Sequence, residues 1–440
     1  MINFALLKDL LVFTRDGEWG KGEPIEDSVK MAVIRGTDFS SVRYGDLSQV
    51  PIRFIPSRLA ARKQLQENDI LIETAGGTKN QPTGRTVFLK SRLFKKSNLS
   101  LICASFSRFL RVDSQLAEPE YVFWYLQYLY ETGEMEKHQI QHTGVARFQY
   151  TNFAETVKIP LPPLDEQKAI AHILGTLDDK IELNQQMNQT LEAIARTIFK
   201  SWFIDFDPVR AKMEGRQPAG MDAETAALFP DEFEDSPLGK IPKGWRVTSL
   251  DQIADFLNGL ALQKYPPDQD DYLPVIKIAE LRKGITKSSG KASPNIDEKY
   301  IIQDGDVLFS WSGSLEAVIW CGGKGALNQH LFKITSKKYP KYFYYEWVKF
   351  HLPEFRSIAA SKATTMGHIQ RHHLTAALVV VPPSNVIEAA NQKMIPLLEN
   401  LILTHLESRT IISIRDTLLP KLLSGEIRVK DAEKVVEEVT

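Results

Sequence analysis

The most regular pattern of hydrophobic and polar positions in this chain lies between Asp165 and Trp202. Apolar residues recur there at alternating spacings of four and three, the heptad pattern of a helix that packs along one stripe. Asp165 follows a proline-rich segment and is expected to be the N-cap. Such a helix of roughly 38 residues is about 60 Å long, so we expect it to separate two parts of the protein. The stripe, called the seam below, consists of Ile170, Leu174, Leu177, Ile181, Asn184, Asn188, Leu191, Ala195, Ile198 and Trp202.

The same pattern returns near the C-terminus. Pro382-Pro383 repeats Pro162-Pro163 at an offset of 220 residues, and the polar interruption of the seam recurs in register. Two copies with matched interruptions favour a paired coiled coil over two ordinary buried helices. Pro396 is a departure from the repeat and predicts a kink or a break in the second helix. The second seam consists of Ala390, Met394, Leu397, Leu401, Thr404, Ser408, Ile411, Arg415, Leu418 and Leu422.

Each long helix follows a globular segment with short β-like runs and one aromatic-rich helical run, and the second segment repeats the order of the first. The paired runs are Met31–Gly36 with Val275–Ile278, Leu65–Ile72 with Ile302–Phe309, and Pro119–Tyr130 with Pro340–Trp347. The fold class is therefore mixed α/β, with two α+β domains and two long helices. We expect a first domain at 1–160, a long helix at 161–204, an acidic connector with little structure at 205–240, a second domain at 241–383, a long helix at 384–425 and a tail at 426–440.

Bulk charge conceals an uneven distribution. The formal net charge is −1, yet Lys79–Arg111 contains eight bases and no acid, and Ala317–Tyr345 and Ser357–Ile387 are also free of acids. Basic runs in both repeats indicate a phosphate-binding surface, although solvated lysine-rich faces are common.

The two cysteines lie far apart, which argues against a disulfide framework or a zinc site and fits a reducing cytoplasm. Lys8 and Asp9 interrupt the apolar N-terminal run, so we expect no signal peptide. No apolar stretch reaches membrane-spanning length, and we expect no membrane association.

Sequence signals of catalysis are missing. The chain has no GxxxxGK[ST] loop, no strand–GxGxxG–helix pattern and no Asn/Asp-Pro-Pro-Tyr/Phe motif of an amino-methyltransferase. Asp178-Asp179-Lys180 resembles half of a nuclease site, but it lies inside the seam helix, where a surface salt bridge is expected instead. His368, His372 and His373 have no carboxylate or cysteine nearby in sequence, so we expect no metal site.

The order of these segments resembles the DNA specificity subunit of type I restriction–modification systems. The resemblance covers essentially the whole chain, and its most specific parts are Pro160–Phe206, Leu238–Trp245, Ala363–Arg371 and Leu418–Ile427. It implies two target-recognition domains that each read one half of a bipartite double-stranded DNA site, and two antiparallel helices that give the monomer an approximate two-fold axis. It also implies two methyltransferase subunits and motor–nuclease subunits as partners. S-adenosylmethionine, ATP and Mg²⁺ would belong to those partners, and this chain would have neither a cofactor nor an active site.

Within this resemblance, loop position and charge select the residues expected to contact DNA. They are Thr78, Lys79, Arg85 and Arg147 in the first domain, and Lys362, His368, Gln370 and Arg371 in the second. The residues expected at helix or subunit contacts are Leu174, Leu177, Ile181, Asn184, Asn188, Leu191, Leu401, Thr404, Ser408 and Ile411. Two alternatives stay open: a coiled-coil adaptor that binds only protein, and a stand-alone DNA methyltransferase or nuclease with a divergent motif.

Overall fold

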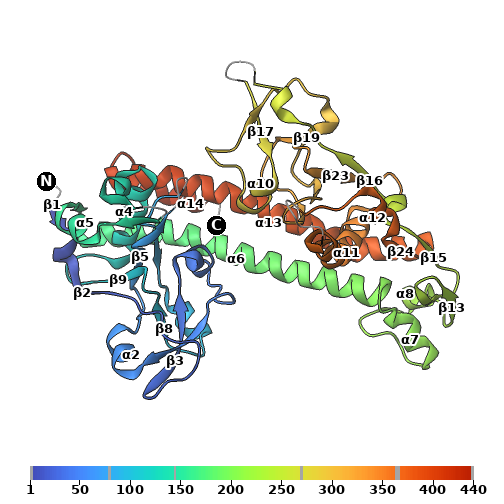
Figure 1. Cartoon of the computed structure of the whole chain (residues 1–440), viewed down its shortest axis with the longest axis horizontal. Helices are drawn as coiled ribbons and strands as arrows, with labels where there is room; N and C mark the ends of the chain where they lie inside the picture. The colour runs from blue at the N-terminus through green and yellow to red at the C-terminus, as the bar shows by residue number, and fades with distance from the viewer. Residues whose placement is uncertain (1–2, 78–80, 143–144, 268–270, 362–366, 438–440) are drawn as a thin grey trace. The chain divides into compact units, whose positions relative to one another are not determined.

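The computed structural model describes residues 3–77, 81–142, 145–267, 271–361 and 367–437. The chain divides into two compact units. Unit 1 contains Met1–Gln185 and Thr410–Thr440, and unit 2 contains Gln186–Arg409. Each unit combines one globular part with portions of the two long helices, α6 (Leu164–Phe203) and α13 (Ser384–Ser424) (Figure 1).

Both long helices are close to the predicted ones. Helix α6 begins at Leu164, so Asp165 lies in the first turn beside Glu166 and is not the N-cap. Carboxylates in the first turn are favoured by the helix dipole, which accounts for this acidic start. The predicted break at Pro396 is wrong, because α13 continues through it. Ala390 and Met394, which precede the proline on the same helix, are buried and hold the helix against the core of unit 2.

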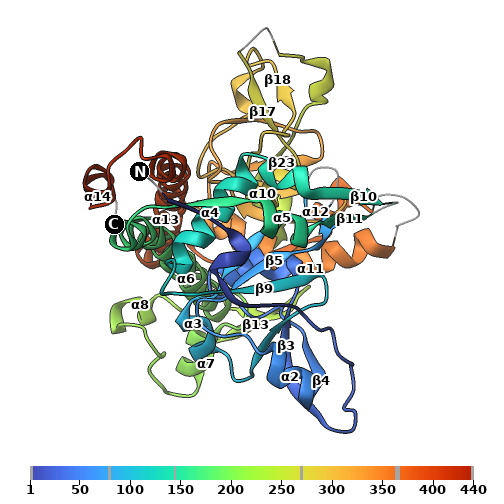
Figure 2. The same ribbon diagram turned by 90° about the vertical axis from the view of Figure 1, so that its left-hand side faces the viewer.

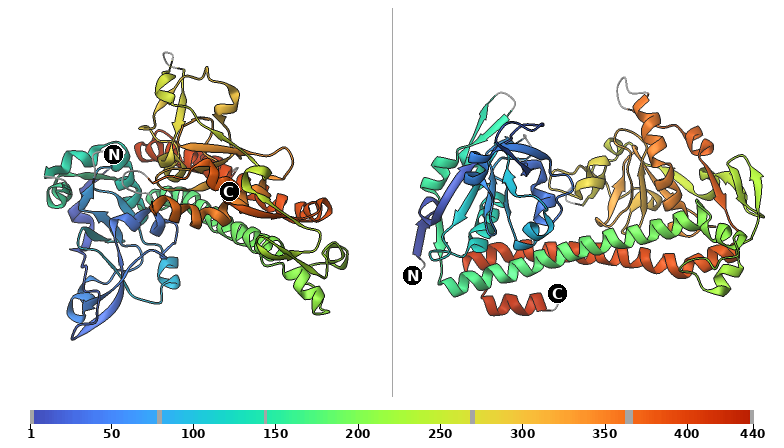
Figure 3. Two further views of the ribbon diagram at one scale, coloured as in Figure 1. Left: turned by 45° about the vertical axis from the view of Figure 1, so that its right-hand side comes forward. Right: turned by 90° about the horizontal axis from the view of Figure 1, so that it is seen from below.

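Portions of both helices share one hydrophobic core within each unit. In unit 1, Leu174 and Leu177 of α6 pack in the same cluster as Leu418 of α13. In unit 2, Trp202 of α6 packs in the same cluster as Ala390 of α13. The N-terminal half of α6 therefore packs against the C-terminal end of α13, which makes the pair antiparallel (Figure 3). Of the predicted contact residues, Leu174, Leu177, Ile181, Asn184, Asn188, Leu401, Thr404 and Ile411 are buried, and Leu191 and Ser408 are half-buried.

The two units repeat one sheet topology. Unit 1 has the antiparallel sheet β2-β9-β5-β7 and unit 2 has β16-β23-β20-β21, so both have the strand order first, last, second, third. Each unit also contains a parallel pair of strands, β3 with β8 and β17 with β22. An antiparallel pair, β1 with β12 and β15 with β24, joins the start of each globular part to the strand that precedes its long helix. The internal repeat is thus confirmed at the level of hydrogen-bonded strands.

Unit 1 is built around strands with continuous apolar runs, such as Ile70-Leu71-Ile72, which are fully buried as expected for a central strand. Its strands are β1 (Asn3–Leu6), β2 (Leu11–Asp16), β3 (Ser28–Ile34), β4 (Ile52–Pro56), β5 (Ile70–Glu73), β6 (Ala75–Gly77), β7 (Thr86–Phe88), β8 (Leu101–Cys103), β9 (Ser107–Val112), β10 (Gln139–His142), β11 (Val145–Phe148) and β12 (Lys158–Leu161). Its shorter helices are α1 (Phe39–Arg43), α2 (Ser57–Lys63), α3 (Ser91–Lys96), α4 (Pro119–Glu131), α5 (Tyr150–Thr156) and α14 (Val429–Glu437), with 3-10 turns η1 (Leu7–Leu10), η2 (Gly36–Asp38) and η3 (Glu134–His138).

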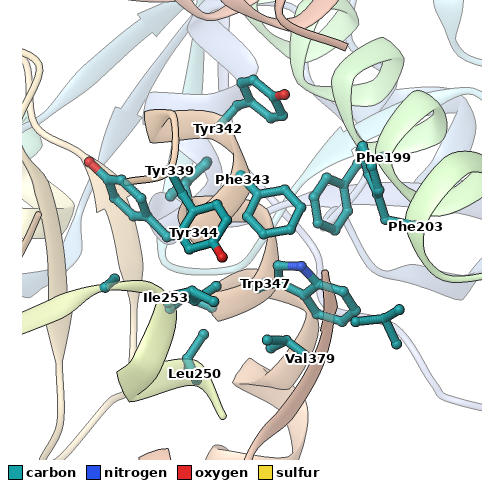
Figure 4. Packing of buried hydrophobic residues seen from close by; sticks show 14 of the residues in the cluster. Phe199, Phe203, Leu250, Ile253, Tyr339, Tyr342, Phe343, Tyr344, Trp347 and Val379 are labelled. Atoms are coloured by element: carbon teal, nitrogen blue, oxygen red, sulfur yellow. The ribbon is translucent and has the colours of Figure 1, made fainter. Parts of the chain in front are cut away.

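Unit 2 has an aromatic core in which α6 and α11 meet. Phe199 lies 5.5 Å from Trp347 and Phe203 lies 5.5 Å from Phe343, both in edge-on arrangements (Figure 4). Its strands are β13 (Phe233–Ser236), β14 (Gly239–Pro242), β15 (Arg246–Ser249), β16 (Asp255–Asn258), β17 (Leu273–Ile276), β18 (Lys291–Ala292), β19 (Ile301–Ile302), β20 (Val307–Ser310), β21 (Ala317–Ile319), β22 (Gly325–Leu327), β23 (Leu331–Thr335) and β24 (Leu378–Val381). Its shorter helices are α7 (Asp207–Met213), α8 (Ala223–Ala227), α9 (Leu250–Ile253), α10 (Ile278–Lys283), α11 (Lys341–Ser361) and α12 (Arg371–Ala376), with 3-10 turns η4 (Leu262–Lys264) and η5 (Glu298–Tyr300).

The acidic segment 205–240 is more ordered than its composition predicts. It contains α7, α8 and the hairpin β13–β14. Phe229 is buried and packs edge-on against Trp202 at 5.3 Å, and Phe206 packs edge-on against Trp245 at 5.7 Å. The prediction of little structure is wrong because a few aromatic anchors bury enough surface to order a segment whose remaining residues are acidic.

Candidate nucleic-acid interface

In unit 1 a glycine-containing strand lies at the edge of a small sheet. Strand β6, Ala75–Gly77, pairs with β11, and Arg147 faces Ala75 in this register. The Phe148 amide donates to the Thr74 carbonyl at 2.9 Å. Strands β10 and β11 form a hairpin (Figure 2), and β11 is the middle strand of this sheet. The Arg147 side chain is exposed on the hairpin, so a cation stands next to backbone that a ligand can approach closely.

Unit 2 repeats this arrangement with different side chains. Ser312 forms a β-bridge with His368, and the Ile369 amide donates to the Trp311 carbonyl at 3.0 Å. The Gly313 amide also donates to the Gly367 carbonyl at 2.8 Å. Arg147 and His368, which the sequence selected separately, therefore occupy equivalent positions of the two repeats.

A glutamine follows two residues after each of these positions. Gln149 precedes α5 and Gln370 precedes α12, and both side chains are exposed. Glutamine can donate and accept hydrogen bonds with a base edge. Gln370 was predicted and Gln149 was missed, although its place in the repeat could have identified it.

The other predicted residues fall into three groups: residues outside the described part of the chain, an exposed cation, and a cation that is paired inside the protein. Thr78, Lys79 and Lys362 lie outside the described residues. Arg371 is exposed; its guanidinium donates to the Phe256 carbonyl at 3.1 Å and lies over the Phe332 ring.

Arg85 is bound within the protein. Its guanidinium makes two hydrogen bonds to the buried Glu73 carboxylate, at 2.9 and 2.6 Å, and these bonds raise the pKa of Arg85. A Cβ placed on Gly36 or Gly76 would come within 2.6 or 3.2 Å of the same carboxylate, so the ion pair sits directly under the glycine segment. In this structure Arg85 braces that segment from within.

The run Lys79–Arg111 is free of acids in sequence but not in space. Helix α6 supplies acids to it: Lys90 and Arg92 contact Asp179 at 2.7 and 2.6 Å, and Arg92 also pairs with Glu182. Further pairs of the run are Lys96–Glu182, Arg108–Asp16 and Arg111–Asp69. Lys90, Arg92 and Lys96 therefore attach the globular part of unit 1 to α6, and other bases of the run pair with acids inside the globular part. The prediction that this run forms a phosphate-binding surface is corrected accordingly.

Asp178 is the buried centre of this attachment. Its carboxylate accepts hydrogen bonds from Arg43 of α1 at 2.7 Å and from Arg415 of α13 at 2.5 Å. Burial alone would raise the pKa of Asp178, but the two guanidinium groups outweigh it and hold that pKa below its ordinary value. Asp178 thus forms a buried ion pair rather than the predicted surface salt bridge, and joins three helices of unit 1.

Further candidate contact residues line a cleft beside the hairpin of unit 1. The cleft has a volume of about 580 Å³ and is lined by Asp16, Thr74, Arg108, Phe148, Gln149, Tyr150, Thr151, Asn152 and Glu155. The Arg108 guanidinium lies 4.4 Å from the centre of the Tyr150 ring, and burial raises the pKa of that tyrosine. The equivalent pair in unit 2 is Phe332 with Arg371, with the cation and the ring exchanged between the two positions. The sequence provided no sign of these cation–ring contacts, because the cation and the ring of each pair are distant in the chain.

Unit 2 has an aromatic and amide cluster at the same surface. The Trp311 indole donates to the Asn258 side chain at 2.9 Å, and Ser312 Oγ lies 3.0 Å from His330 Nδ1. The Trp311 ring lies 5.8 Å from His330 and 6.2 Å from His368. Half-buried rings, amides and imidazoles of this kind suit contact with nucleobases. Trp311 directly precedes Ser312-Gly313, the counterpart of Ala75-Gly76 in unit 1, and this repeated glycine was the available sequence signal.

Two features that other functions require are not found in the described part of the chain. Among those residues no group of three or more His, Cys, Asp or Glu side chains could hold a metal ion. None of the described helices is both long enough and apolar enough to span a lipid bilayer.

Two exposed, equivalent surfaces built on one repeated fold define a duplicated recognition module. The family model described as type I restriction modification DNA specificity domain matches residues 7–193 and 242–415, once in each half. The chain therefore belongs to the family of type I restriction–modification DNA specificity subunits. It is a specificity subunit and not a catalytic one, and the adaptor and stand-alone enzyme alternatives are not favoured.

Individual relatives agree with this membership. The type I restriction enzyme HindI specificity subunit of Haemophilus influenzae is 25% identical, over 83% of this chain and 88% of its own length. The MjaIX specificity subunit of Methanocaldococcus jannaschii is 28% identical, over 70% of this chain and 69% of its own. The crystal structure of a type I restriction–modification S subunit from M. genitalium shares the fold, with a TM-score of 0.53 at 15% identity and 96% coverage of both chains.

Proposed function

We propose that this chain selects the DNA sequence on which a type I restriction–modification complex acts, and that each unit reads one half of a bipartite target. The observation that carries the proposal is the duplicated surface, at which Arg147 and His368 occupy equivalent positions beside a glycine segment. Exposed cations position a protein on phosphates, and side chains that reach base edges provide specificity. Different side chains on one repeated frame give each unit a different half-site.

The residues proposed to contact DNA follow from the placement of their side chains. Arg147 and Gln149 serve the first half-site, and His368, Gln370 and Arg371 serve the second. Arg85 acts indirectly, by holding Glu73 beneath the glycine segment.

The catalytic partners are proposed to be two methyltransferase subunits, with motor–nuclease subunits completing the restriction complex. S-adenosylmethionine, ATP and Mg²⁺ belong to those partners, and the complex works in the cytoplasm. An apolar groove on α6 supports docking of a methyltransferase subunit. It is lined by Gln189, Thr190, Ala193, Ile194, Thr197 and Ile198 and has a volume of about 460 Å³. Ile194 is 43% exposed there, so its apolar side chain is available to a partner.

The proposed docking is tested by co-purification. Ile194→Asp is expected to abolish capture of the methyltransferase subunit by the tagged chain. Ile285→Asp, which changes the same residue type at a similar exposure, 38%, outside the long helices, serves as the control. Unchanged capture by the Ile194 variant would place the docking surface elsewhere.

The test of DNA selection is sequencing of methylated positions in DNA from cells with and without this chain. A bipartite methylated motif that requires the chain is expected. Gln149→Ala is expected to relax only the first half of the motif and Gln370→Ala only the second, whereas Arg216→Ala, an exposed connector variant, leaves it unchanged. Methylation that is independent of the chain, or a variant that relaxes both halves, would contradict the proposal.

The long helices are proposed to set the spacer between the half-sites. Both α6 and α13 continue from one unit into the other, so residues added to both lengthen the chain between the two readers. Insertion of four residues near Asn184 together with four near Thr404 is expected to change the non-specific spacer while both half-sites stay the same. Unchanged spacing would show that the helices do not determine it.

A further inference from the structure

An exposed phenylalanine stands beside the glycine segment of unit 1. Phe106 lies between β8 and β9, and its side chain is 67% exposed. Its carbonyl accepts hydrogen bonds from the Thr74 amide at 2.8 Å and from the Ala75 amide at 3.3 Å. Since Ala75 pairs on its other side with Arg147, Phe106 and Arg147 flank the same stretch of backbone.

A single exposed apolar side chain is common and by itself means little. Phe106 is distinguished by its backbone position, which is repeated in unit 2. The Trp311 amide donates to the His330 carbonyl just as the Thr74 amide donates to Phe106. Two residues before these rings the match continues. The Asn328 amide donates to the Ile276 carbonyl, and the Ala104 amide donates to the Ile34 carbonyl.

The two units therefore present a flat ring at one equivalent position of the recognition surface. In unit 2 the ring is polar and is held by Ser312 Oγ at 3.0 Å. In unit 1 the ring is hydrocarbon and is the most exposed large apolar side chain of the described residues. A phenyl ring offers a nucleobase no hydrogen bond, so it can contribute through stacking or by inserting between base pairs.

We propose that Phe106 stacks on a base of the first half-site and opens one base step there, and that His330 contacts the equivalent base of the second half-site. The proposal rests on the proposed function, because it names how that same surface reads DNA. Arg147, one strand away, holds the adjacent phosphate and so places the ring at the base step. Cations around an apolar ring match double-stranded DNA, whose charged backbone flanks apolar base faces.

The experiment uses the assembled methyltransferase complex and a duplex that contains the target identified by methylation sequencing. 2-Aminopurine is placed at successive positions of the first half-site, and its fluorescence reports local unstacking. Phe106→Ala is expected to weaken binding of the target by roughly 5- to 150-fold and to abolish a fluorescence change at one step. Phe106→Trp is expected to retain both, whereas Phe106→Leu keeps the apolar bulk but loses the fluorescence change.

Phe4→Ala is the matched control, because Phe4 is 61% exposed in the same unit but lies on β1, in a different sheet. It is expected to bind as the wild type does. His330→Ala is expected to reduce discrimination only in the second half-site.

The outcomes separate this inference from the proposed function. A wild-type complex without sequence-dependent binding would overturn the proposed function. A wild-type complex that binds specifically, with equal binding and equal fluorescence for Phe106→Ala, would overturn the inference alone. Loss of the methyltransferase subunit from the Phe106→Ala complex would show that the ring is a protein contact, which also overturns the inference.

Discussion

Replacement of Asp178 by asparagine tests whether the buried ion pair attaches the globular part of unit 1 to the long helices. The substitution keeps the shape of the side chain but removes the charge that two guanidinium groups share. The side chain of Asp178 is 5% exposed and that of Arg415 is 9% exposed, so water can do little to compensate. Removal of one partner from a buried pair typically costs about 3–5 kcal/mol. Arg43 is less buried and keeps a hydrogen bond to Gln127, which favours the lower end, about 3 kcal/mol.

Hydrogen exchange of the full-length chain at neutral pH measures this loss by region. Protection of the most protected amides of unit 1 is expected to fall by roughly 10²-fold, which corresponds to about 3 kcal/mol. Unit 2 contains none of Asp178, Arg43 and Arg415, so its protection serves as an internal control. Lys137→Ala, which removes an exposed pair with Glu134, is a matched control expected to change stability by less than about 1 kcal/mol.

The same variant predicts a change in pH dependence. Because the folded-state pKa of Asp178 is lowered, its stabilisation is present above the ordinary carboxylate pKa of about 4 and is lost as pH falls below it. Asp178→Asn should therefore remove part of the stability difference between pH 7 and pH 3. In Asp178→Asn the only acid left beside the buried Arg415 guanidinium among the described pairs is the exposed Asp416. Adding Arg415→Met removes this poorly compensated charge and should restore part of the loss. A fall in the protection of unit 1 by less than about 5-fold for Asp178→Asn would refute the reasoning. It would mean that solvent screens the Asp178 ion pair as strongly as it screens a pair on the protein surface.

Three further predictions concern other parts of the chain. Burial raises the pKa of Glu346 to about 7, so ionisation of this side chain destabilises the fold as pH rises from about 4.5 to 7. Glu346→Gln should therefore raise the melting temperature at pH 8 and leave it nearly unchanged at pH 4.5. An equal effect at both pH values would count against a buried acid. Phe229→Ala should destabilise unit 2 by about 3–5 kcal/mol, measured by denaturant unfolding, whereas a segment without packing would lose almost nothing. Gly76→Ala forces a side chain to φ +124° near Glu73 and should cost about 1–3 kcal/mol and weaken DNA binding. Gly133→Ala, also at positive φ but with open space around its Cβ, should lower stability without affecting DNA binding.

The sequence by itself determined the long helices and the repeat. Heptad spacing depends only on which side chains are apolar, and a proline-rich stop depends on local backbone geometry, so both can be recognised without a structure. For the same reason the central strands and the aromatic helix α4 were predicted within a few residues. The start of α11 was predicted as well, but this helix continues to Ser361, far beyond the predicted end at Trp347. The helix continued past Pro396 because packing on one face overrode a local preference, and Phe229 ordered an acidic segment in the same way.

Only the tertiary structure decided which charges are available to a ligand. Lys90, Arg92 and Arg85 looked alike in sequence, but folding brings Asp179 and Glu73 to them from other parts of the chain. Electrostatic pairing depends on distance in space, which charge along a sequence does not encode. The equivalence of Phe106 and His330 likewise follows from hydrogen bonds between segments that are remote in the chain. Short-range periodicity thus determined the framework, and long-range contacts determined the surface with which it recognises its partner.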